Sequence, residues 1–316
     1  MSRFSFSLND APTPQAAIEI TGGRVTAVAV EDRGGRPVIA AHATETLPDT
    51  ALVPTLNGQN VRDKALVAAT VARVLERIGR PGRVGLIVGD PVVKVSLVRL
   101  QQVPANPQDL EQVIRWQVRK TAPFAVDDAQ VGYQAGLTAD DGQDFLVTLA
   151  RRDVIAEYEA LCQAAGAHAG LVDLSTFNVV NTVLASGQAP AGDWLLVNVA
   201  PGWESIAIMR GAHPVFFRNH SAEGEGTLAD LVHQTAMYYE DRLSGSGFGR
   251  VLLSGAAGVG ESEPVRTALA ERLGTSVETV DPTKAATFAD RITADARLLD
   301  SVTPLVGLVL RSREAA

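Results

Sequence analysis

Apolar and polar positions alternate along the first part of the chain in short runs that are rich in β-branched residues. Three such runs occupy residues 16–21, 24–30 and 37–46, and they are separated by residues 22–23 and 33–35. Both separators contain a pair of glycines, which adopt positive φ without strain and therefore fit tight hairpin turns. The pattern predicts a three-stranded antiparallel meander.

Helical spacing replaces this alternation after residue 60. Apolar side chains recur on one face of residues 61–79 until a glycine and Pro81 end the run, which predicts a helix. Asn106 and Pro107 supply an N-cap and a first-turn proline for a second helix. The same patterns in the first half predict strands at 83–88, 92–100, 129–135 and 144–150, and helices at 108–120, 153–165 and 175–184.

The opening pattern recurs after a linker, residues 186–192, that is rich in Gly, Ala and Pro. Glu19 and Asn198 occupy the same place before their respective turns, so the two halves resemble copies of one unit, a meander followed by a helix. The predicted strands of the second half are 194–199, 204–209, 214–219, 250–254 and 276–280, and its predicted helices are 227–243, 263–273 and 304–311.

Composition narrows the class of protein. A hydrophobic content of 46 % in 316 residues is ample for a buried core, and the net charge of -8 has the wrong sign for binding nucleic acid. The longest apolar runs, residues 84–88 and 305–310, are too short to cross a membrane, and the N-terminus lacks the apolar segment of a secretion signal. With one cysteine, Cys162, the chain forms no internal disulfide, and we expect a cytoplasmic protein without direct membrane insertion.

Two halves that each begin with a hairpin predict a fold in which the two turns face each other across a cleft. Backbone N–H groups at such turns can cradle phosphates, and a carboxylate at the strand end can hold a metal ion or position a water. This is the plan of the actin, Hsp70 and sugar-kinase superfamily. We therefore predict an α/β, actin-like fold of two domains with a duplicated β-meander. Taken singly, residues 22–23 also fit an ordinary hairpin turn, and residues 255–260 an ordinary strand-to-helix connection.

Other residue types offer no stronger site. The five histidines show no metal-ligand spacing with one another or with Cys162, so a metal site is not expected. Cys162 fits a small packing residue on the apolar side of its predicted helix. Two interpretations remain open for one group of basic residues: a basic patch that binds acidic groups, or a solvated helix face. These residues are Arg115, Arg119, Lys120, Arg151 and Arg152.

Several longer stretches resemble the type IV pilus assembly protein PilM family. The most specific is LEQVIRWQVRKTAPFAVDDAQVGY at residues 110–133, which is similar to that family's helix, Pro-Phe turn and following strand. Residues 145–166, 170–184, 251–258 and 271–282 extend the resemblance. The family is actin-like and is related to FtsA and to the cytoplasmic domain of GspL.

The resemblance and the repeated pattern together give the expected domains. They are a mobile leader at 1–14, a first actin-like domain at 15–187 with a small inserted subdomain at about 104–150, a second actin-like domain at 188–303, and a C-terminal helix at 304–316 that packs back on the first domain.

The resemblance also implies a nucleotide site on three loops. Its candidate residues are Glu19, Thr21, Gly22 and Gly23 in the first loop, Asn198 and Gly202 in the second, and Gly255, Ala256, Ala257 and Gly258 in the third. All three loops depart from the family pattern: the first has Glu for Asp, the second has Asn for Asp and a proline at 201, and the third has two alanines between its glycines. Because Asn198 is neutral and Pro201 lacks an N–H, we expect a degenerate site without hydrolysis, which leaves ATP and magnesium open as ligands.

The resemblance implies an adaptor or scaffold in a type IV pilus or related secretion platform rather than an enzyme. Such a protein binds the cytoplasmic N-terminal tail of a PilN-like inner-membrane protein, lies at the inner membrane through that partner, and is open to self-association in a ring. The tail groove would lie near residues 104–150, where the sequence gathers Trp116, Phe124, Val126 and Tyr133. Two alternatives remain: an active actin-superfamily ATPase or small-molecule kinase, and an FtsA-like cell-division scaffold.

Overall fold

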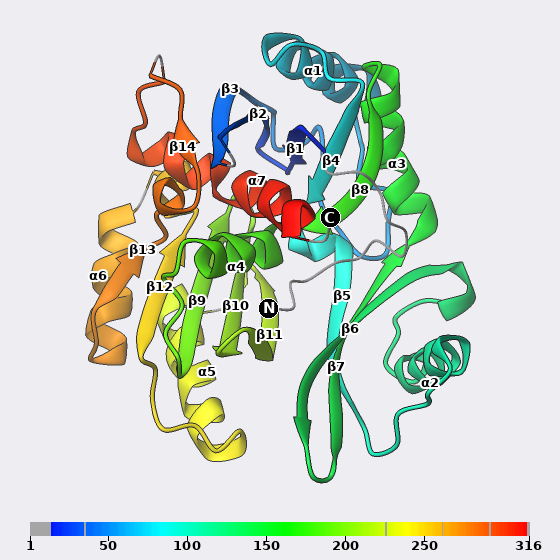
Figure 1. Ribbon diagram of the computed structural model, residues 1–316, viewed down its shortest axis with the longest axis vertical. Helices are drawn as coiled ribbons and strands as arrows, with labels where there is room; N and C mark the ends of the chain where they lie inside the picture. Colours follow the sequence, from blue (N-terminus) through cyan, green and yellow to red (C-terminus); the bar gives the residue numbers. More distant parts are fainter. Residues whose placement is uncertain (1–13, 35, 225, 261, 291, 315–316) are drawn as a thin grey trace.

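A computed structural model describes residues 14–314 except for residues 35, 225, 261 and 291. The expected leader therefore lies outside the described residues, apart from Pro14. The described part forms three separate β-sheets with helices packed around them (Figure 1).

The first sheet has six strands in the order β14-β3-β2-β1-β4-β8. Its antiparallel meander confirms the one predicted from the glycine pairs, and β1, β4 and β8 run parallel to one another. The sequence pattern did not predict β8, because a glycine and an aspartate interrupt its apolar run. This sheet and its helices consist of β1 (Ala16–Ile20), β2 (Arg24–Arg33), β3 (Arg36–Thr46), β4 (Arg83–Val88), β8 (His168–Leu174) and β14 (Thr287–Phe288), with α1 (Lys64–Arg77) and α3 (Arg152–Ala164).

The second sheet repeats this plan with five strands in the order β11-β10-β9-β12-β13. Its meander is antiparallel, and β12 runs parallel to both β9 and β13. The elements are β9 (Asp193–Ala200), β10 (Trp203–Arg210), β11 (His213–Ser221), β12 (Arg250–Ser254) and β13 (Val277–Thr279), with α5 (Leu228–Arg242) and α6 (Ser262–Leu273).

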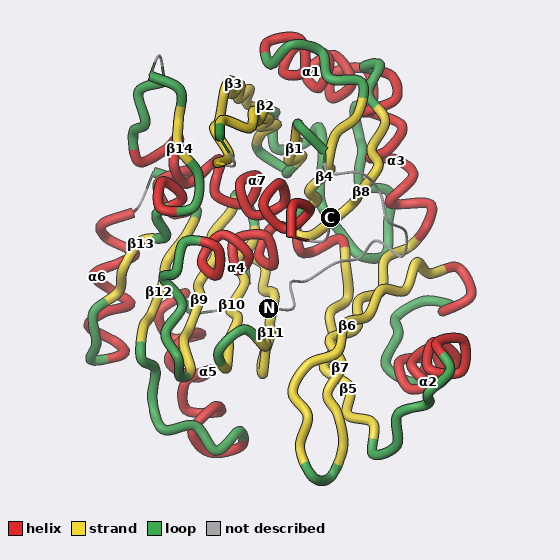
Figure 2. Tube along the Cα trace, in the orientation of Figure 1, coloured by secondary structure: helices red, strands yellow, loops and turns green. Residues whose placement is uncertain are grey.

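A third sheet stands apart from the other two, with its helix α2 at its side (Figure 2). It starts with β5, before the expected start of the insertion at residue 104. Its own apolar core includes Ile114 and Val118 of α2 together with Phe145 of β7. The elements are β5 (Val93–Leu100), α2 (Pro107–Arg119), β6 (Ala129–Ala139) and β7 (Gly142–Arg151), in the strand order β5-β7-β6.

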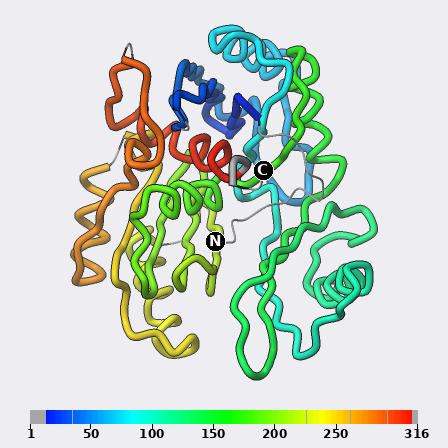
Figure 3. The backbone as a smooth tube through the Cα atoms, viewed as in Figure 1, coloured from blue at the N-terminus to red at the C-terminus, as the bar shows by residue number. Residues whose placement is uncertain are grey.

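Two further helices lie between the sheets, and one of them, α4, joins the first domain to the second. Helix α4 (Ser175–Ala185) leads from β8 to β9, and α7 (Ala296–Glu314) follows β14 and packs on β1, β2 and β4 of the first sheet. Figure 3 shows this C-terminal helix beside the N-terminal strands. Helix α7 begins earlier than the predicted residue 304, because Pro304, which resembles a helix start in the sequence, lies inside the helix.

Helices α4 and α7 touch at a glycine. A Cβ at Gly307 of α7 would overlap the backbone carbonyl oxygen of Asn178 in α4 and would lie 2.8 Å from Oγ1 of Thr182. The hydroxyl of Thr182 also donates to the carbonyl of Thr303 at 2.6 Å. The helices are therefore in backbone contact, and only a residue without a side chain fits at the crossing.

We predict that Gly307→Ala destabilises the protein. Alanine in a helix ordinarily stabilises by up to about 1 kcal/mol relative to glycine, but overpacking a tight core costs about 1–3 kcal/mol or more. Gly82→Ala is the control, because its Cβ would meet no atom within 4 Å. Urea denaturation should give a lower free energy of unfolding for Gly307→Ala and a nearly unchanged one for Gly82→Ala; a stabilised Gly307→Ala would contradict the close crossing.

Candidate functional site

The structure brings the first two candidate loops face to face. A Cβ at Gly23 would lie 3.0 Å from Cβ and Cγ of Pro201, so the meander turns of the two domains are in van der Waals contact. On the other side, a Cβ at Gly22 would lie 3.3 Å from both the carbonyl oxygen of Leu52 and Cδ of Pro54. The ring of Pro201 therefore occupies part of the space between the two turns.

Glu19, the candidate acid of the first loop, lies buried at the end of β1. Its Oε1 accepts a hydrogen bond from the hydroxyl of Ser175 at 2.7 Å, and its Oε2 lies 3.8 Å from Nη2 of Arg24. Burial raises the pKa of this carboxyl, while Arg24 and Ser175 act in the opposite direction. Thr21 closes the turn, because its N–H and hydroxyl both donate to the carbonyl of Arg24, at 3.0 and 3.1 Å.

A second buried carboxylate, Asp90, lies beside Glu19 and was missed in the sequence. It follows β4 closely and is fully buried. Its Oδ1 accepts from the backbone N–H of Thr176 at 3.1 Å, and its Oδ2 accepts from the hydroxyls of Thr176 and of Ser205, the latter at 2.6 Å. Ser205 belongs to β10, so Asp90 joins the two domains.

Asn198, the candidate residue of the second loop, completes this network. Its Nδ2 donates to the hydroxyl oxygen of Thr176 at 2.9 Å, and Nδ2 of Asn219 donates to the hydroxyl oxygen of Ser205 at 3.0 Å. Both hydroxyls donate in turn to Asp90. A carboxylate at position 198 could not donate and would add another negative charge, so the asparagine fits the place where the family pattern has an acid.

The third candidate loop follows β12 and forms the short 3-10 turn η3 (Ala256–Val259). Gly255 has φ +84°, and a Cβ there would overlap the carbonyl oxygen of Val199. The N–H of Ala257 donates to the carboxylate of Asp300 in α7 at 2.7 Å. The guanidinium of Arg24 packs against Gly258. The third candidate loop therefore contacts β9, α7 and, through Arg24, the first candidate loop.

The described residues contain no group of three or more His, Cys, Asp or Glu side chains placed to hold a metal ion. The carboxylates nearest to such a role, Glu19 and Asp90, accept hydrogen bonds from the protein itself. In this arrangement the cleft is a polar junction between the domains.

A cavity of about 650 Å³ lies between the inserted subdomain and the first domain. Strands β6 and β8, which face it from opposite sides, are each the last strand of their sheet in the described part of the chain. The apolar part of the wall comes from Val88, Val93, Ala150, Ile155, Leu171 and Val172. Arg152 and Glu159, which are exposed on α3, contribute one charge of each sign.

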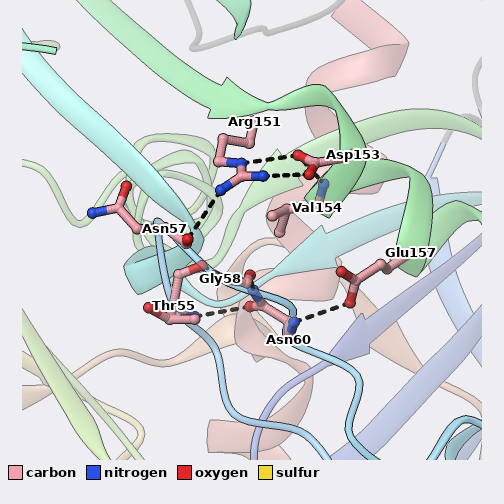
Figure 4. A network of polar contacts seen from close by, with 8 residues as sticks. All are labelled: Thr55, Asn57, Gly58, Asn60, Arg151, Asp153, Val154 and Glu157. Carbon is pink, nitrogen blue, oxygen red and sulfur yellow. Dashed lines mark hydrogen bonds and ion pairs between the residues drawn. The ribbon is translucent and has the colours of Figure 1, made fainter. Parts of the chain in front are cut away.

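Hydrogen bonds connect the end of β7 and α3 to the loop at residues 54–61, which carries Pro54 (Figure 4). The carboxylate of Glu157 in α3 accepts from the N–H groups of Asn60 at 3.0 Å and Val61 at 2.9 Å. Arg151, at the end of β7, donates to the carbonyl of Asn57 at 2.9 Å. The loop therefore lies against Gly22 at Pro54 and is held by α3 and the end of β7 at residues 57–61.

The predicted aromatic cluster does not line this cavity. Val126 is buried in the core of the subdomain, with Phe124 and Tyr133 packed against that core. Trp116 is 58 % exposed, and its ring faces the ammonium of Lys120 at 5.1 Å. Of the basic residues singled out in the sequence, three are paired with acids: Arg115 with Glu111, Arg119 with Asp127, and Arg151 with Asp153.

Comparison with known proteins identifies the family. Residues 17–244 match the family described as type IV pilus assembly protein PilM. The chain belongs to this family. No curated protein sequence matches the chain.

Solved structures agree with this assignment at the level of the fold. A chain of a PilM-PilN type IV pilus biogenesis complex superposes with a TM-score of 0.80 at 17 % identity, covering 95 % of this chain and 99 % of that one. A Bacteroides thetaiotaomicron protein with an actin-like ATPase fold and unknown function gives a TM-score of 0.50 at 9 % identity, with 94 % and 96 % coverage. The predicted actin-like fold of a PilM-family protein is thereby confirmed. Every helix in the described part is too short or too polar to span a bilayer.

We predict that Asp90 makes the stability of this PilM-family protein depend on pH. Burial raises the pKa of Asp90 from 3.8 to about 6. A raised carboxyl pKa means that the folded state holds the proton more tightly than the unfolded state. The contribution of Asp90 to the free energy of unfolding is therefore complete below about pH 4 and is lost as the pH rises through about 6. Two pKa units correspond to about 3 kcal/mol.

The measurement is urea denaturation of wild type and Asp90→Asn at several pH values between about 4 and 7. The free energy of unfolding of the wild type should fall across this range relative to that of Asp90→Asn. Asp49→Asn, which removes an exposed carboxylate, should give a curve parallel to the wild type. Parallel curves for Asp90→Asn as well would contradict the raised pKa.

Proposed function

We propose that this protein is a cytoplasmic adaptor of a type IV pilus assembly platform that binds the N-terminal tail of a PilN-like inner-membrane protein. The observation that carries the proposal is the cavity between β6 and β8. Its position, between the inserted subdomain and the first domain, agrees with the groove that the family resemblance implies. Through this tail the protein would lie at the inner membrane.

The two strands that face the cavity suit an extended peptide. The terminal strand of a sheet presents backbone N–H and C=O groups that can pair with an added strand. Between them, Ile155 of α3 and Leu171 of β8 belong to an apolar wall that can bury alternate side chains of the tail. Backbone pairing would supply much of the affinity for the tail, and the apolar wall would supply the specificity for its side chains.

The cleft between the domains favours an adaptor over an ATPase or kinase. Asn198 donates hydrogen bonds and carries no charge for magnesium, and Glu19 is held by Ser175 and Arg24. Pro201 fills the space against Gly23. Phosphoryl transfer needs a metal and a positioned water at this point. Asn198 offers no charge to a metal, and Oε2 of Glu19, which accepts no hydrogen bond from the described residues, is buried beside Arg24.

Our prediction for the tail uses one substitution in the cavity. Ile155→Asp places a charge in the apolar wall and should weaken binding of a synthetic peptide of the PilN-like tail at least about tenfold, which is about 1.4 kcal/mol. Titration of the peptide, followed by calorimetry or fluorescence anisotropy, measures the loss. The thermal midpoint of the variant establishes that it remains folded.

Val103→Asp is the matched control, because Val103 is an apolar residue that is 41 % exposed and is not among the residues lining the cavity. It should leave peptide affinity unchanged. Equal affinity for Ile155→Asp and the wild type would place the tail elsewhere. Equal loss in both variants would point to a general effect of added charge.

For the cleft we predict that hydrolysis of magnesium-ATP stays at background. The physical reason is the neutral side chain of Asn198, which leaves the buried Glu19, already paired with Ser175 and Arg24, without a second carboxylate from the facing loop. A phosphate-release assay on the purified protein makes the measurement. Steady release that disappears in Glu19→Ala would establish the ATPase alternative instead.

A further inference from the structure

A second cavity, of about 470 Å³, adjoins the cavity between β6 and β8. Arg152 lines both cavities, so they meet at this residue. The wall of the second cavity is charged and aromatic, whereas that of the first is largely apolar. It is formed by Phe124, Asp128, Arg151, Arg152 and Asp153. A ligand that extends from the first cavity into the second would therefore contact two different kinds of wall.

Two of these residues, Arg151 and Asp153, are paired with each other (Figure 4). Nε of Arg151 donates to Oδ1 of Asp153 at 2.9 Å, and Nη2 donates to Oδ2 of the same carboxylate. Nη1 donates to the carbonyl of Asn57, also at 2.9 Å. The hydrogen bonds from Arg151 lower the pKa of Asp153, which keeps that carboxyl ionised. The opposite charges of this pair therefore offset each other.

Asp128 provides a negative charge that is not offset in this way. Among the described residues, its carboxylate makes no hydrogen bond or ion pair. The pKa of Arg151 is raised by its hydrogen bond to Asp153 and by the charges of Asp153, Asp128 and Glu157, so three carboxylates surround this guanidinium. Arg152 adds a second cation, and one negative charge remains. The second cavity therefore favours a cationic group over an anionic one.

Phe124 adds an aromatic ring to the same wall. The residue is half-buried and also packs against the apolar core of the inserted subdomain, so its position is fixed by that core. The face of an aromatic ring attracts a cation, and the attraction is strongest for ammonium and guanidinium groups that have lost part of their water. A ring and an unpaired carboxylate in one cavity together suit the side chain of lysine or arginine.

We propose that the second cavity is a subsite for a basic side chain, lysine or arginine, of the tail whose apolar residues occupy the cavity between β6 and β8. The cation would pair with the carboxylate of Asp128 beside the ring of Phe124. This proposal rests on the proposed binding of the tail and adds a charge to what the protein recognises in it. Because the two cavities meet at Arg152, the order of the basic and apolar residues in the tail would also determine the direction in which it lies.

The test is an exchange of charge between protein and peptide. The probes are the synthetic tail peptide and versions of it in which each Lys or Arg is replaced singly by Glu. Asp128→Lys should weaken binding of the unchanged peptide about fivefold or more, because a favourable ion pair becomes a repulsive one. One Glu version should bind weakly to the wild type and more tightly to Asp128→Lys. Asp128 is exposed, so the variant should fold, and its thermal midpoint checks this.

Asp127→Lys is the matched control. It changes the net charge by the same amount at a neighbouring side chain that is 85 % exposed and does not belong to the wall of either cavity. It should leave the affinity for every peptide nearly unchanged. Equal losses in Asp127→Lys and Asp128→Lys would overturn the subsite, and so would a tail that carries no Lys or Arg, or Glu versions none of which binds better to Asp128→Lys.

A dependence on salt gives a second readout. Raising the sodium chloride concentration should weaken binding of the unchanged peptide more in the wild type than in Asp128→Asn, because the ion pair is screened. Equal slopes would overturn the subsite. Wild-type affinity in Asp128→Lys together with a loss in Ile155→Asp would overturn the subsite alone, whereas a tail peptide that does not bind the wild type would overturn the proposed function and the subsite with it.

Discussion

The contact between α4 and α7 is the constraint on which the rest of the structure depends. Helix α4 carries the chain from the first domain to the second, α7 packs on the first sheet, and the two meet backbone to backbone where Gly307 faces Asn178. Polar groups reinforce the crossing: the hydroxyl of Thr182 donates to the carbonyl of Thr303, and Arg311 pairs with buried Asp173. Because protein interiors are close-packed, a crossing this tight leaves the two domains little freedom to separate at this side.

The close contact between the two domains determines which side chains can be buried in the cleft. With Pro201 against Gly23, no bulk water separates the domains there, so each buried carboxylate needs its own donors. Asp90 receives them from Thr176 and Ser205, and Asp300 from the N–H of Ala257. Glu19 and Asn198, which the family resemblance assigns to the nucleotide site, bind Ser175 and Thr176 of the protein itself in this structure.

Local patterns in the sequence were enough for most of the fold. Glycine-containing turns and alternating apolar positions predicted both meanders, since hairpins are specified by neighbouring residues. The same patterns did not predict β8, whose strand run is interrupted, and placed the start of α7 too late at Pro304. They could not reveal the partners of Asp90 or Asp300, because these contacts join residues 43 to 115 positions apart. Loop residues such as Glu19 and Asn198 were found through the family pattern, whereas their bonding required the folded chain.

The groove and the cleft share one short segment of chain. Asp173 at the end of β8 lines the cavity, and the nearby residues Ser175 and Thr176 bind Glu19 and Asp90 in the cleft. The loop beside Gly22 adds a second link, because Glu157 holds it to α3. Close-packed interiors transmit strain, and these links consist of the covalent chain or of hydrogen bonds. An occupant of the groove that displaced the end of β8 would therefore also displace Ser175 and Thr176, which bind Glu19 and Asp90 in the cleft.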